Sequence, residues 1–149
     1  IAANIEPHRP DYSLAKSLTE YDRRGETRPA DLIALSVEAI LKRITPPTVI
    51  VPTRSGATAR SIARFRLPVW ITAVSALDQT CQNLMFSYGV LPVHEPDHPE
   101  DWKKWTAAYL KNWNLDGDLV VLTEGPSKKR PDRNNRMEIL DLNNMFKKS

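Results

Sequence analysis

Short apolar runs alternate with segments of helical periodicity along most of the chain, and this alternation restricts the fold more than any other feature. Four continuous apolar runs predict strands that are buried on both faces, over Thr48–Val51, Pro68–Val74, Val90–Val93 and Leu119–Thr123. A fifth run, Met137–Leu142, alternates enough to form an edge strand. Strands that alternate with helices are typical of a mostly parallel sheet with helices on both faces. The sequence therefore predicts an α/β domain.

The segments between these runs predict four helices. The first begins at Pro29, because proline is tolerated in the first turn, and ends before Pro46. The others are expected over Thr58–Phe65, from Asp78 as N-cap to Gly89 as C-terminal stop, and over Glu100–Trp113. Apolar side chains at helical spacing should form one face of each of the last two helices. These are Cys81, Leu84, Met85 and Tyr88 on the third, and Trp102, Trp105, Tyr109 and Trp113 on the fourth.

Length and composition indicate one globular domain: the chain has 149 residues, of which 41% are hydrophobic and 26% charged. Residues 1–28 are polar and interrupted by prolines, so we assign them to an N-terminal arm that precedes a domain at 29–149. The single Cys81 excludes a disulfide framework and fits a reducing compartment. No apolar run approaches the roughly 18 residues of a membrane helix, and the N-terminus lacks a signal-peptide pattern. We therefore expect a cytoplasmic chain with no membrane partner.

The net charge of +3 hides an uneven distribution. Residues 46–75 carry four arginines and no acid, residues 76–126 carry three lysines against eight acids, and residues 127–149 carry seven basic against three acidic side chains. If the fold brings the two basic islands, 46–75 and 127–149, to one place, they form an anion site. The alternative is two solvated faces.

A loop in the first basic island has the components of a phosphate cradle. Thr53–Thr58 joins a buried strand to a helix, Gly56 permits a tight turn, and three hydroxyls lie beside Arg54. The loop lacks the Gly-Lys-Ser/Thr ending of a nucleotide P-loop, and it lacks the three-glycine dinucleotide fingerprint. The alternative is a simple strand–helix turn whose serine and threonine side chains cap the helix.

The residues around this loop resemble a known family. The segment from Val49 to Arg60 reads Val-Ile-Val-Pro-Thr-Arg-Ser-Gly-Ala-Thr-Ala-Arg. It resembles the Thr-x-Ser-Gly-x-Ser/Thr-Ala segment in the C-terminal α/β domain of pyruvate kinase. The likeness resumes at Asp116–Gly125 and at Asn134–Met137, and it covers residues 29–142 in the order of the family.

The resemblance implies a three-layer α/β/α domain with a five-stranded mixed sheet, of order 3-2-1-4-5 and with strand 5 antiparallel. It also implies a regulatory role, in which the domain binds a phosphorylated small-molecule effector: a sugar bisphosphate, a sugar monophosphate or AMP. Carried over by position, the phosphate cradle is formed by Thr53, Arg54, Ser55, Gly56 and Thr58. The loop that covers the effector supplies Gly125, Lys128, Lys129, Arg130 and Arg133, and Trp102 resembles an effector-contacting tryptophan. The implied strand order brings both basic islands to one rim, at the Thr53–Thr58 loop and the Gly125–Asn135 loop.

Two departures count against a sugar bisphosphate. Ala57 stands where the family often has arginine or lysine. The helix before strand four is shorter than in the members that respond to a sugar bisphosphate, and no arginine matches the one that follows their tryptophan by one to two turns. The catalytic barrel of pyruvate kinase, which holds Mg²⁺ and K⁺, has no counterpart in 149 residues. We therefore expect no cofactor in this chain and no phosphate transfer by the chain alone. Its partner would be a parent catalytic domain or further copies of itself.

The alternative function is a small stand-alone enzyme that acts on a phosphorylated substrate. It needs a general base or nucleophile on the same rim, for which the acids are Asp78, Glu95 and Glu124. Cys81, on an apolar helix face, is interpreted as a buried filler. Whether the chain is an enzyme is left open by the sequence.

Two further motifs suggest ligands that we do not expect. His94 and His98 flank two carboxylates, but Pro96 and Pro99 prevent the helical geometry that would place both imidazoles on one face, so no metal is predicted. The basic run at 128–130 matches a nucleic-acid patch, yet such a short run is usually a solvated loop. No nucleic-acid partner is predicted.

Overall fold

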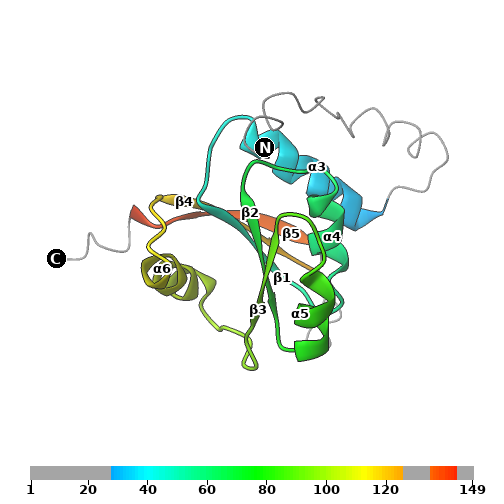
Figure 1. The fold of residues 1–149 in the computed structure, drawn as a ribbon. Coiled ribbons are helices and arrows are strands. Elements are labelled where there is room, and N and C mark those ends of the chain that lie inside the picture. Colours follow the sequence, from blue (N-terminus) through cyan, green and yellow to red (C-terminus); the bar gives the residue numbers. More distant parts are fainter. Residues whose placement is uncertain (1–27, 126–134, 144–149) are drawn as a thin grey trace, which may run out of the picture.

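The computed structural model describes residues 28–125 and 135–143, and these form one mixed sheet flanked by helices (Figure 1). The strands are β1 (Thr48–Pro52), β2 (Trp70–Ser75), β3 (Val90–His94), β4 (Leu119–Glu124) and β5 (Arg136–Asp141). They lie in the order β3-β2-β1-β4-β5. Neighbours among the first four are parallel, and β5 pairs antiparallel with β4. The predicted fold class, strand order and edge position of the last strand are confirmed.

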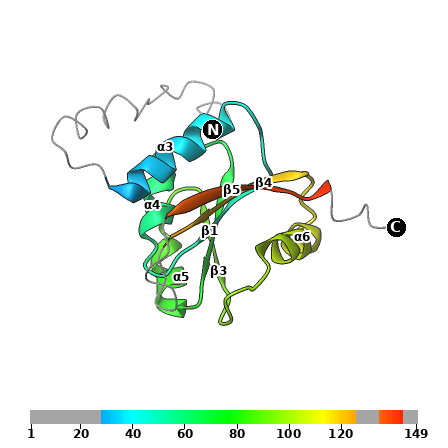
Figure 2. The same cartoon turned by 180° about the vertical axis from the view of Figure 1, so that it is seen from behind.

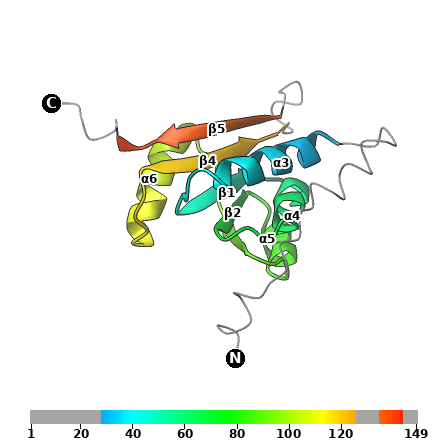
Figure 3. The same cartoon turned by 90° about the horizontal axis from the view of Figure 1, so that it is seen from above.

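Helices cover both faces of the sheet. They are α3 (Pro29–Leu41), α4 (Ala57–Ala63), α5 (Asp78–Leu84) and α6 (Trp102–Asn112). Figures 1 and 2 show α3, α4 and α5 together on one face and α6 alone on the other. Seen from above, the sheet is the middle of three layers (Figure 3).

Two hydrophobic cores follow from the alternation of side chains along the strands. In β1, Val49 and Val51 lie in the core beneath α3, α4 and α5, whereas Ile50 lies in the core beneath α6. The first core also takes Ala59 and Ile62 from α4. Because each central strand is buried on both faces, its sequence is a continuous apolar run rather than an alternating one.

The third helix is shorter than predicted. It ends at Leu84, so Cys81 and Leu84 are buried, but Met85 is 69% exposed and Tyr88 is 47% exposed. The Ile71 amide donates to the Gly89 carbonyl (2.8 Å), which aligns the start of β3 with β2. The chain must leave the helix early to reach this register, and the prediction that Met85 and Tyr88 face inward is wrong.

The predicted N-cap of the same helix is also wrong. Leu77 occupies the N-cap position, Asp78 is already inside the helix, and the Asp78 carboxylate accepts a hydrogen bond from Gln82 Nε2 (2.6 Å). The Leu77 amide donates to Ser75 Oγ (3.2 Å). Ser75, the last residue of β2, therefore organises the turn that leads into α5, a role that the sequence predicted for Asp78.

The aromatic stripe on α6 is confirmed, although the helix ends at Asn112. Trp102 and Trp105 meet edge to face, Trp105 stacks on Tyr109 at 5.1 Å between ring centres, and Tyr109 contacts Trp113. The stripe is buried at its start, where Trp102 is 8% exposed, and exposed at Trp113. Asp101 caps the helix by accepting a hydrogen bond from the Lys104 amide (3.0 Å). None of the helices in the described ranges is long and apolar enough to cross a membrane.

Candidate functional site

The loops predicted to share one rim lie at the same edge of the sheet. β1 is parallel to both β2 and β4, with Val49 opposite Ile71 on one side and Val121 on the other. The carboxyl ends of these strands therefore meet at one edge, where open α/β sheets bind ligands. The Thr53 amide donates to the Val74 carbonyl (2.8 Å), which ties the first residue of the candidate loop to β2.

The candidate loop from Thr53 to Thr58 is organised by its own hydroxyls. Gly56 has a φ of 77° and donates its amide to Thr53 Oγ1 (2.9 Å), and the Ala57 amide donates to Ser55 Oγ (3.4 Å). These bonds are those expected of a strand–helix turn. Because each hydroxyl serves here as an acceptor, its own O–H is left to donate to a ligand. Arg54 and Ser55 are exposed.

Helix α5 supports this loop from beneath. Thr80 Oγ1 donates to the Arg54 carbonyl (2.6 Å), and Thr80 is buried. Gly56 lies so close to Leu84 that a Cβ at this position would come within 2.9 Å of Leu84 Cδ2. The loop is thus held by a buried hydrogen bond and by close packing.

The first basic island is divided by the fold. Arg60 returns to the loop, where its Nη2 donates to the Ser55 carbonyl (2.9 Å). Arg64 pairs with Asp31 on α3, and Arg66 lies over the Tyr88 ring at 5.6 Å. Helix α4 runs back from the rim, so Arg64 and Arg66 lie at its far end. Of the first basic island, the structure therefore places Arg54 in the loop and Arg60 against it, whereas Arg64 and Arg66 lie away from the rim.

The basic side chains that the second island was predicted to supply to the effector loop lie outside the described residues. They are Lys128, Lys129, Arg130 and Arg133. The two ends of that loop meet, since a Cβ on Gly125 would lie 3.0 Å from Asn135 Oδ1.

An ion pair joins the strands at the base of the same loop. Arg136 Nη2 contacts Glu124 Oε2 at 2.5 Å, and His98 Nε2 lies 3.6 Å from Glu124 Oε1. Glu124 is 8% exposed, and its carboxylate is engaged in these contacts within the protein.

Trp102 is the first residue of α6 and lies in the core beneath that helix. Its ring is buried beneath α6 and meets His98 edge to face at 5.3 Å. Its indole nitrogen has no hydrogen-bond partner within the part of the chain that the structure describes. Trp102 belongs to α6, which covers the face of the sheet opposite α4 (Figures 1 and 2). Its role as an effector contact stays a prediction.

The acids that the enzyme alternative needs make structural contacts. Besides Asp78 and Glu124, Glu95 accepts a hydrogen bond from Trp105 Nε1 (2.9 Å). Burial, and then the nearby charge of Asp78, raises the pKa of the Cys81 thiol, which keeps it protonated and a poor nucleophile. In the described part of the rim, these three acids are therefore engaged in contacts within the protein.

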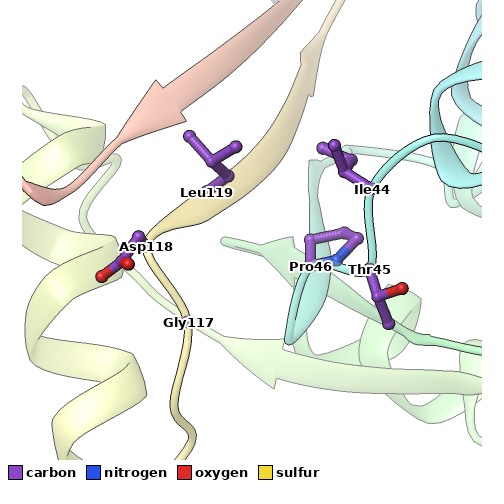
Figure 4. Close-up of a pocket in the computed structure, with 6 residues that line it drawn as sticks. All are labelled: Ile44, Thr45, Pro46, Gly117, Asp118 and Leu119. Carbon is purple, nitrogen blue, oxygen red and sulfur yellow. The ribbon is translucent and has the colours of Figure 1, made fainter.

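Metal-binding side chains and one further pocket are other candidate sites in the described residues. Within 28–125 and 135–143, no three His, Cys, Asp or Glu side chains gather closely enough to hold a metal ion. His94 Nε2 instead lies 3.3 Å from the Ala76 carbonyl oxygen. A pocket of about 330 Å³ lies between the segments that enter β1 and β4, at the edge of the sheet opposite the candidate loop (Figure 4). Its lining residues are Ile44, Thr45, Pro46, Gly117, Asp118 and Leu119.

The geometry defines a three-layer α/β domain with a hydroxyl- and arginine-bearing loop at the carboxyl edge of its sheet. The family model described as "Pyruvate kinase, alpha/beta domain" matches residues 31–140. The chain therefore belongs to the pyruvate kinase α/β domain family, as its loop sequence indicated.

Individual relatives agree with this family. The pyruvate kinase of Thermococcus litoralis is 33% identical over 114 residues, which cover 75% of this chain and 24% of that protein. The pyruvate kinase of Staphylococcus epidermidis is 27% identical over 133 residues, covering 83% of this chain and 22% of that protein. The chain thus spans about a quarter of the length of these relatives.

A solved structure shows the same fold. Cryptosporidium parvum pyruvate kinase in complex with ADP has a TM-score of 0.68 at 22% identity, covering 78% of this chain and 24% of that one.

Proposed function

We propose that this chain is a regulatory domain of pyruvate kinase type that binds a phosphorylated metabolite at the loop from Thr53 to Thr58. The observation that carries the proposal is the loop itself. In a member of this family, it presents hydroxyl donors and the guanidinium groups of Arg54 and Arg60 at the carboxyl edge of β1.

The chemistry of the loop suits a phosphoryl group. The O–H groups of Thr53 and Ser55 can each donate one hydrogen bond, and the exposed Arg54 can offer two parallel N–H donors to phosphate oxygens. Binding would add ligand contacts to a loop whose backbone is already held by hydrogen bonds to β2 and α5. The metabolite would in this way stabilise one arrangement of the rim.

The proposed role is regulation of an active partner rather than catalysis. Phosphate transfer would belong to a barrel that binds Mg²⁺ and K⁺ and is carried by a parent catalytic domain. Further copies of the chain are the other proposed partner. We propose that this takes place in the cytoplasm.

A thermal unfolding assay with phosphorylated ligands tests the proposal. Ribose 5-phosphate, AMP, glucose 6-phosphate, fructose 1,6-bisphosphate and sulfate are each titrated into the purified chain. A ligand at about 100 times its dissociation constant should stabilise the folded chain by about 2.7 kcal/mol. Replacing both Ser55 and Thr58 with alanine should abolish this shift, because it removes two hydroxyls of the loop.

The control for this double variant is Thr45→Ala, which removes an exposed hydroxyl at the opposite edge of the sheet. It should leave the ligand-induced shift unchanged. No shift with any ligand at millimolar concentration argues against an intact site, and a full shift in the Ser55/Thr58 variant means that the ligand binds elsewhere.

A further inference from the structure

We infer that Arg60 is a phosphate-binding residue of this loop and selects a doubly charged phosphomonoester over singly charged anions. The inference rests on the proposed function and adds a residue from outside the Thr53–Thr58 segment. Its basis is the contact between the Arg60 guanidinium and the loop, together with the charges around it.

The Arg60 side chain folds back from α4 onto the loop. Its Nη2 donates to the Ser55 carbonyl at 2.9 Å. The guanidinium also lies over Gly56, since a Cβ there would come within 2.8 Å of Arg60 Nη1. Any residue other than glycine at position 56 would push the guanidinium away, so Gly56 provides room for Arg60 as well as a turn.

The charge of Arg60 is not neutralised by a neighbouring acid within the described ranges. Arg28 and Arg64 pair with Asp31, and Arg136 pairs with Glu124 and Glu138, whereas no ion pair of Arg60 is found there. Arg60 is exposed, and one N–H of its guanidinium donates to the Ser55 carbonyl. A guanidinium group has further N–H donors, which here can reach a ligand on the loop.

The position of Arg60 compensates for the absence of charge within the turn. Ala57 contributes no cation, so the loop segment itself offers only Arg54. Arg60, the fourth residue of α4, places a second guanidinium beside Ser55. Two guanidinium groups balance the charge of a phosphomonoester dianion, and their planar donor sets match phosphate oxygens.

Titration with inorganic phosphate, followed by thermal unfolding at constant ionic strength, tests this role. In Arg60→Ala, the phosphate concentration that gives the half-maximal shift should rise by about 10- to 100-fold, as expected for loss of a hydrogen bond to a charged group. Arg60→Lys keeps the charge but not the planar donor set. Its half-maximal phosphate concentration should therefore lie between those of the wild type and of Arg60→Ala. The matched control is Arg43→Ala, which removes an exposed arginine that follows α3 at the opposite edge of the sheet.

A second titration with acetate tests selectivity. The wild-type chain should prefer phosphate to acetate by a wider margin than Arg60→Ala does. An unchanged phosphate response in Arg60→Ala, or a loss of equal size in Arg43→Ala, overturns the role of Arg60 and leaves the proposed function standing. If the wild-type chain responds neither to phosphate nor to any phosphorylated ligand, the proposed function itself fails and this inference with it.

Discussion

Gly56→Ala is expected to lower the free energy of unfolding by about 3 kcal/mol and to remove the response to phosphorylated ligands. At a φ of 77°, a residue with a Cβ costs about 1–2 kcal/mol. The added methyl would also lie 2.9 Å from Leu84 Cδ2, and such overpacking costs about 1–3 kcal/mol. The same methyl displaces Arg60 from the loop. Urea unfolding with and without ligand measures both effects.

Gly89→Ala is the matched control, because it separates backbone strain from crowding. Gly89 has a φ of 66°, but a Cβ there meets nothing within 4 Å. Gly89→Ala should lower the free energy of unfolding only by the backbone strain of about 1–2 kcal/mol, and it should keep the ligand response. Equal destabilisation of the two variants, or a normal ligand response in Gly56→Ala, would contradict the packing described for this loop.

Asp31→Asn is expected to lower the free energy of unfolding by about 2 kcal/mol at neutral pH. Asp31 is buried on α3, and its carboxylate accepts hydrogen bonds from Arg28 Nε (3.0 Å) and from Arg64 on α4. Hydrogen bonds to charged groups contribute about 1.5–3 kcal/mol. Loss of these hydrogen bonds should loosen the contact between α3 and α4. Chemical denaturation of the variant measures the change in the free energy of unfolding.

The Asp31 contribution should depend on pH in a definite direction. Burial raises the pKa of this carboxyl, but the hydrogen bonds and charges of Arg28 and Arg64 outweigh burial and hold it below its usual value. A lowered pKa in the folded state means that the stabilisation is present above the unfolded pKa of about 3.9 and is lost as the pH falls through the folded value. The difference in the free energy of unfolding between the wild type and Asp31→Asn should therefore disappear in acid.

Glu38→Gln controls for the loss of one negative charge from α3. Glu38 pairs with the exposed Lys42 one turn away, an arrangement that contributes about 0.5 kcal/mol or less. It should leave stability nearly unchanged at every pH. A gap for Asp31→Asn that persists unchanged in acid would show that the ion pairs do not account for its effect.

Much of the fold could be predicted from the sequence, because the strands are buried on both faces. That burial requires continuous apolar runs such as Val49–Val51, and turn residues mark where each run ends. The strand order came from the family resemblance, since periodicity alone does not say which strands are neighbours.

The limits of prediction lie where tertiary contacts override local pattern. Met85 and Tyr88 continue the helical spacing of α5, yet the pairing of Ile71 with Gly89 takes the chain out of the helix before them. Asp78 is a good N-cap by residue type, but the helix begins one residue earlier. Local propensity cannot detect either effect.

The candidate site was predictable in its backbone and less so in its charges. The motif from Thr53 to Thr58 located the loop, and the parallel strands place it at the edge where open α/β sheets generally bind ligands. Counting charge along the chain treated Arg60, Arg64 and Arg66 alike. Only the structure shows that Arg60 turns toward Ser55 while Arg64 turns toward Asp31. The spacing of Arg60 four residues after Gly56, one helical turn, could have suggested it.

Amide chemical shifts during a ligand titration test the central claim most directly. In a ¹⁵N-labelled chain titrated with ribose 5-phosphate or AMP, the amides of Ser55, Gly56 and Ala57 should shift most, in proportion to saturation. The amides of Thr45 and Gly117, in the pocket at the opposite edge, should stay in place. Shifts centred on that pocket or on α6, or no shifts at millimolar ligand, would contradict the assignment of the effector site to this loop.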